Sequence, residues 1–175
     1  MISNIIELYN FIKKMNEDLK NNRKDVFKTH VEDAYQKANI VLKNYLDIFS
    51  LIRTNIKKEN WGAQEVISYI EDVEYEHKDM RIYLRTLEGA HVPSGFWFGD
   101  EYEIFLNSIT QILICKNGLR ENEHTLLGFA RKCREIQIFD LYVQQQMILK
   151  EVNSILKNLE YAWEIVCISY NKIKV

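Results

Sequence analysis

The chain has 175 residues, of which 47% are hydrophobic and 27% are charged, so it can form one folded domain with a substantial core. Its net charge of -2 gives no general attraction to nucleic acid or membranes, and no apolar run approaches the length of about 18 residues that a membrane span needs. One proline and six glycines are too few turn residues for a sandwich of short strands. The composition therefore predicts an all-α protein, with residues 1–175 as a single domain.

The same features favour the cytoplasm as the compartment. Met1 leads directly into polar, helical sequence without the apolar core of a signal peptide. The three cysteines, Cys115, Cys133 and Cys167, are an odd number and lack Cys-x-x-Cys spacing. We therefore expect reduced thiols rather than a disulfide framework or a zinc ribbon.

The first half of the chain predicts two helices, or one long one. Apolar residues spaced alternately by four and three predict an N-terminal helix over residues 1–23, and no Gly or Pro stops it from continuing into a helix over residues 24–58. The second helix carries a heptad seam of the kind that packs along another helix in coiled coils. That seam consists of Phe27, Val31, Ala34, Ala38, Val41, Tyr45, Ile48 and Ile52.

The middle of the chain predicts two shorter helices around a loop. Asn60 is a suitable N-cap for a helix over residues 61–88, whose seam contains His77 as its one polar member. Residues 89–99 form a loop, and Asp100 has the spacing of a capping box that opens a helix over residues 100–117.

The last third of the chain has no Pro, so residues 119–174 predict a single helix of about 55 residues, with a bend or break near Asp140 as the alternative. Its later part carries a second heptad seam, formed by Ile148, Val152, Ile155, Leu159, Ala162, Val166, Ser169 and Ile173. Because the connections are short, we expect an elongated antiparallel bundle of four or five helices, in which the chain reverses direction after residue 118. The long first and last helices then project beyond the others and pair with each other or with another copy, which favours a homodimer or a protein partner.

One candidate site is a metal centre. Glu74 and His77, and likewise Glu121 and His124, have the i, i+3 spacing that places two ligands on one helix face. This spacing resembles the Glu-x-x-His element of ferritin-like di-iron bundles, and the resemblance implies Fe, Mn or Zn as the ion. Counting residues along antiparallel helices places both pairs at about the same height, opposite Asp47. The helix over residues 100–117 offers no carboxylate at that height.

A second candidate is RNA cleavage. Arg85 and His91 have a spacing similar to the Arg-x4–6-His motif of HEPN ribonucleases, which are all-α. The resemblance implies that His91 would act as acid and base, and that Arg85 would hold the phosphate. Thr86 follows the arginine where that family usually has a polar Asn, His or Asp.

A third candidate is the loop itself, in which Phe96, Trp97 and Phe98 are consecutive. Three adjacent aromatic side chains either plug the open end of a bundle or anchor a partner, since Trp and Phe dominate binding hot spots. Basic clusters such as Arg131, Lys132 and Arg134 are too short to predict a nucleic-acid surface.

Taken together, the sequence favours a non-enzymatic protein-interaction or adaptor module without a cofactor. It would act through the heptad-patterned helices and the aromatic loop. The metal-binding bundle and the ribonuclease are the alternatives.

Overall fold

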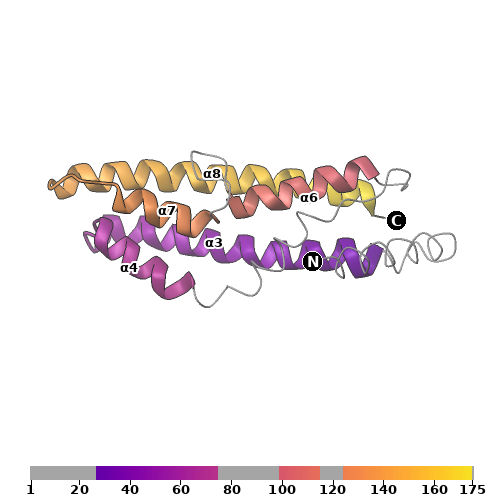
Figure 1. Ribbon diagram of the computed structural model, residues 1–175, viewed down its shortest axis with the longest axis horizontal. Helices are drawn as coiled ribbons and strands as arrows, with labels where there is room; N and C mark the ends of the chain where they lie inside the picture. Colours follow the sequence, from indigo (N-terminus) through magenta and orange to yellow (C-terminus); the bar gives the residue numbers. More distant parts are fainter. Residues whose placement is uncertain (1–26, 75–98, 115–123, 175) are drawn as a thin grey trace, which may run out of the picture.

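The computed structural model of the chain describes residues 27–74, 99–114 and 124–174. This part of the chain is all-α and contains no strand, and its helices lie along one long axis (Figure 1), so the predicted elongated helical bundle is confirmed. The elements are a π-helical turn η1 (Phe27–Glu32) and five α-helices: α3 (Asp33–Lys58), α4 (Ala63–Glu74), α6 (Gly99–Ile114), α7 (Thr125–Arg134) and α8 (Leu141–Ile173).

Two long helices, α3 and α8, form the frame of the bundle, with 26 and 33 residues respectively. At the end of α3 the chain turns back into α4. The α6 helix lies along the C-terminal half of α8, and α7 continues in the same direction toward the other end of the molecule (Figure 1). The chain then reverses through residues 135–140 and returns as α8, so both α6 and α7 run antiparallel to α8.

The prediction of a single helix over residues 119–174 was wrong, and the alternative of a break near Asp140 is confirmed. The α7 helix ends at Arg134 with basic residues in its last turn, as the helix dipole favours. Asp140 then caps α8, because its Oδ1 accepts a hydrogen bond from the Val143 amide at 2.9 Å. The reversal therefore comes after α7, and residues 125–134 continue in the direction of α6 instead of reversing as predicted.

Two predicted helix starts were also misplaced. The α3 helix ends at Lys58 as expected, but Asn60 lies in the turn with a φ of 55° rather than capping α4. Asn tolerates this left-handed conformation better than most residues. The amide of Gly62 instead donates to the Glu65 carboxylate at 2.9 Å at the start of α4. Likewise α6 begins at Gly99, so Asp100 lies inside its first turn.

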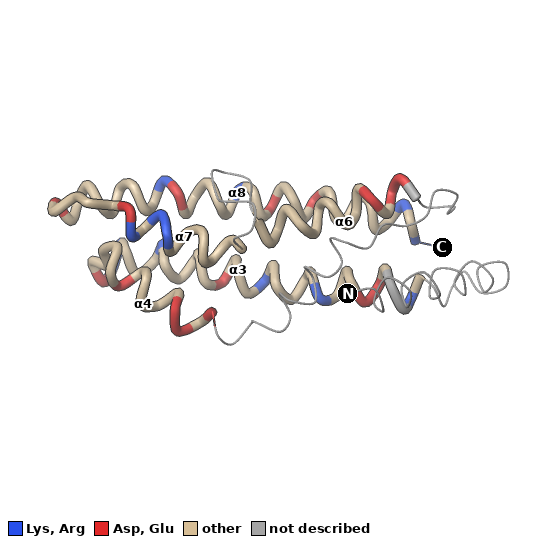
Figure 2. The backbone as a smooth tube through the Cα atoms, viewed as in Figure 1, with Lys and Arg blue, Asp and Glu red and all other residues tan. Residues whose placement is uncertain are grey.

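Charged residues link α7 to both of its neighbours. Figure 2 shows the basic end of α7 near the acidic residues of α4. Arg134 pairs with Glu71 of α4, and Lys132 donates to Glu151 of α8 at 2.6 Å. Both side chains of the Arg134–Glu71 pair are about half exposed, so this pair contributes little to stability.

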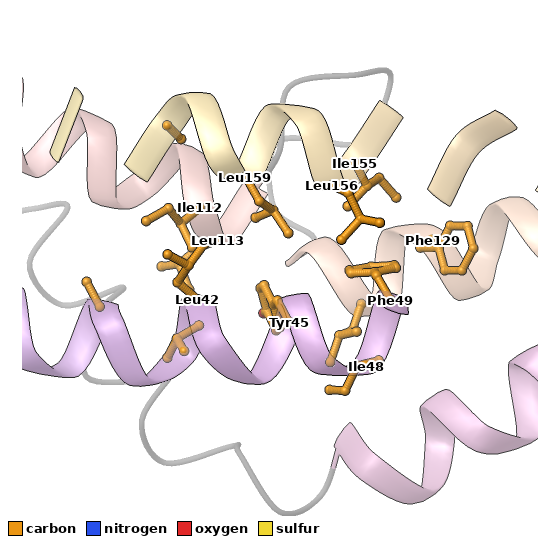
Figure 3. Close-up of a cluster of buried hydrophobic side chains, with 14 of the residues drawn as sticks. Leu42, Tyr45, Ile48, Phe49, Ile112, Leu113, Phe129, Ile155, Leu156 and Leu159 are labelled. Carbon is orange, nitrogen blue, oxygen red and sulfur yellow. The ribbon is translucent and has the colours of Figure 1, made fainter. Parts of the chain in front are cut away.

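The core lies where α3, α6, α7 and α8 meet (Figure 3). Phe49 packs edge-on against Phe129 of α7, with ring centroids 5.2 Å apart. Every residue of the two predicted heptad seams is buried, from Phe27 to Ile52 and from Ile148 to Ile173. Ile109, Ile112 and Leu113 complete the core from α6.

The first and last helices pair with each other at the end of the bundle that contains η1. Tyr35 of α3 lies against Tyr170 and Trp163 of α8, with centroid distances of 4.1 and 5.1 Å. Phe27 also contacts Tyr170 at 5.6 Å. Of the two pairings that the sequence left open for these helices, the structure shows the one within the chain.

Several predictions lie outside the described residues: the helix over residues 1–23, the second half of the helix over residues 61–88, the turn at Gly118 and the loop over residues 89–99 except Gly99, which begins α6. Within the described ranges, no helix is both long enough and apolar enough to cross a membrane.

Candidate functional site

The turn between α7 and α8 forms the end of the bundle opposite to η1. This turn reaches beyond the neighbouring turn between α3 and α4 (Figure 1). The end of α7 is closed by the Glu135 amide, which donates to the Arg131 carbonyl at 3.1 Å. Asp140 begins α8 as described above. Both helix termini at this end are therefore capped, which holds the turn in a defined shape.

Burial alternates along this turn and leaves one aromatic side chain, Phe139, exposed. Between residues 136 and 139 the chain is not helical, and its side chains alternate between half-buried and exposed. Ile136 and Ile138 are half-buried, whereas Gln137 and Phe139 are exposed. The relative exposure of Phe139 is 104%, so none of the residues that the structure describes covers this ring.

Phe139 is the first of a cluster of exposed apolar residues. Ten large apolar side chains are exposed in the part of the chain that the structure describes, and five of them fall within residues 139–147. The other five are spread singly over α3, α6 and α8, as is normal for a protein surface. We name the cluster the end patch: Phe139, Leu141, Tyr142, Val143 and Met147.

Two glutamines fix the end patch to the turn between α3 and α4. Oε1 of Gln144 accepts from the Ala63 amide at 3.2 Å, and its Nε2 donates to the Ile138 carbonyl. Gln145 donates to the Trp61 carbonyl at 3.3 Å. A Cβ atom at Gly62 would lie 3.0 Å from both Gln144 and Leu141, so the two turns pack closely there. The end patch therefore lies on an ordered support rather than on a loose loop.

Both signs of charge lie beside the end patch. Glu135 and Asp140 are exposed in the turn that carries it. Lys57 and Lys58 are exposed in the last turn of α3, next to the exposed Glu59. An apolar centre with a charged rim is the usual composition of a protein interface.

The predicted metal ligands Glu74 and His124 do meet. Nε2 of His124 lies 3.0 Å from Oε1 of Glu74, and the imidazole is almost fully buried. Nδ1 of His124 accepts from the Leu127 amide at 3.4 Å, so the residue caps α7. With Nδ1 as acceptor, the proton is assigned to Nε2, which donates to Glu74. This contact joins the end of α4 to the start of α7.

Of the remaining predicted ligands, the structure describes only Asp47. Asp47 is exposed on α3. Among the described residues, no three His, Cys, Asp or Glu side chains are grouped closely enough to hold a metal ion. His77 and Glu121 lie outside those residues, as do the aromatic loop residues Phe96, Trp97 and Phe98 and the pair Arg85 and His91.

Cys133 lacks the lowered pKa of a reactive thiol. Burial raises the pKa of Cys133 from its ordinary value to about 12, with a smaller contribution from the nearby Glu151 carboxylate. Cys133 therefore stays protonated at neutral pH, whereas nucleophilic cysteines need a lowered pKa. Cys167 is half-buried and lies 3.8 Å from the Tyr35 hydroxyl, and neither cysteine is in a disulfide.

The end patch was missed when the sequence was read. Residues 136–143 alternate or cluster apolar side chains next to Asp140, and they fall between two regular seams. Phe139 and Tyr142 also lie off the seam of the last helix, which is a signal that they face solvent. The chain matches no family model, no curated protein and no solved structure.

Proposed function

We propose that this protein is a non-enzymatic interaction module, an adaptor that binds protein through its end patch. The observation that carries the proposal is the full exposure of Phe139 among four other exposed apolar side chains at the end of an elongated bundle. Exposed apolar residues that are scattered singly are ordinary, whereas an exposed apolar patch marks a binding surface, and these five residues lie within nine positions at one end of the bundle.

The arrangement suits binding in two further respects. Phe139 and Tyr142 are residues of the type that supplies most of the binding energy in interface hot spots. The hydrogen bonds of Gln144 and Gln145 order the surface in advance, so binding loses less conformational entropy. The predicted aromatic loop with Phe96, Trp97 and Phe98 would add a second contact. Under this proposal, the double variant F96A/W97A also weakens binding.

Site-specific photo-crosslinking tests the proposal. We would place a benzoylphenylalanine at position 139, and at position 104 as the control, because Ile104 is an exposed apolar residue on α6 far from the end patch. Irradiation in intact cells should give a crosslinked species of defined mass from position 139. The protein that carries benzoylphenylalanine at position 104 should not give that species. Adding Y142S to the position 139 variant should abolish it. Equal labelling from both positions, or none from position 139, would contradict the proposal.

A metal site is the second candidate function, and the Glu74–His124 contact favours it. A carboxylate oxygen and an imidazole nitrogen 3.0 Å apart could both bind one ion if Nε2 lost its proton. Fe, Mn or Zn should then be present in stoichiometric amounts in untagged protein purified without chelator, and lost in H77A/H124A. Metal content that is unchanged in this variant would contradict the candidate.

A further inference from the structure

We draw no further inference here: the strongest candidate, the end patch at the turn between α7 and α8, is a cluster of exposed apolar side chains, and nothing in the part of the chain that the structure describes shows what covers it.

Discussion

His124 connects two helices because its ring has two distinct nitrogen atoms. Nδ1 caps α7 by accepting from the Leu127 amide, and Nε2 reaches Glu74 at the end of α4. A capping aspartate or serine could satisfy the amide but would be too short to reach both partners. The residue that the sequence marked as a candidate ligand thus has a structural role in the part of the chain that the structure describes.

Substitutions at position 124 separate these two contacts. H124A removes the cap and the contact with Glu74, and should lower the free energy of unfolding by about 1–2 kcal/mol. H124N keeps a side-chain acceptor suited to an N-cap, and should recover about half of that loss. Urea unfolding of the three proteins measures the difference. Equal destabilisation by H124A and H124N would show that the cap contributes nothing.

Cys133 makes stability depend on pH in the alkaline range. Burial raises its pKa from the ordinary value of 9.0 to about 12, so the folded state keeps a proton that the unfolded state has lost. The resulting stabilisation is complete below pH 9 and is lost as the pH rises toward 12. Above pH 9, the free energy of unfolding should therefore fall more steeply with pH in the wild type than in C133A. The two slopes should differ by up to about 1.4 kcal/mol per pH unit. Parallel slopes in urea titrations at several pH values would contradict this.

At the scale of elements, the regular helices could be predicted from the sequence and the turns could not. Both heptad seams are buried as predicted, because a repeat of four and three defines one helix face wherever the helix packs. The break at residues 135–140 was left open because no Gly or Pro marks it. It depends on Asp140, which caps α8 only once the chain has turned. Asn60 was misread for a related reason, since Asn suits both an N-cap and a left-handed turn.

The candidate site could be predicted only in part. Counting residues along the helices placed Glu74 and His124 at one height, and they do lie in contact, although α7 runs opposite to the predicted direction. The end patch could not be predicted in this way. Its exposure depends on how far the α7–α8 turn extends past α4, which is a property of the packed molecule.

Gln144 is the residue that should hold the two turns together. Q144A removes the acceptor for the Ala63 amide and the donor to the Ile138 carbonyl, and should cost about 1–2 kcal/mol of unfolding free energy. Q146A is the matched control, because Gln146 is exposed two residues away on the same helix and should change stability by less than about 0.5 kcal/mol. Thermal unfolding compares the two, and equal melting temperatures for both variants would contradict the role of Gln144.

At the scale of the whole molecule, the two ends of the bundle differ. At one end, α3 and α8 close on each other through Tyr35, Trp163 and Tyr170. At the other end, α8 begins with apolar residues that are exposed. A rigid bundle that is closed at one end and apolar at the other is suited to holding a partner at a fixed position.

Hydroxyl-radical footprinting tests the central claim, that the end patch is covered by protein, most directly. Tyr142 in the end patch and Tyr161 on the same helix have nearly equal relative exposures of 68% and 65%, so each serves as the reference for the other. In dilute purified protein the two should be oxidised to the same extent. In intact cells, Tyr142 should be protected relative to Tyr161. An unchanged ratio of oxidation in both settings would contradict the claim.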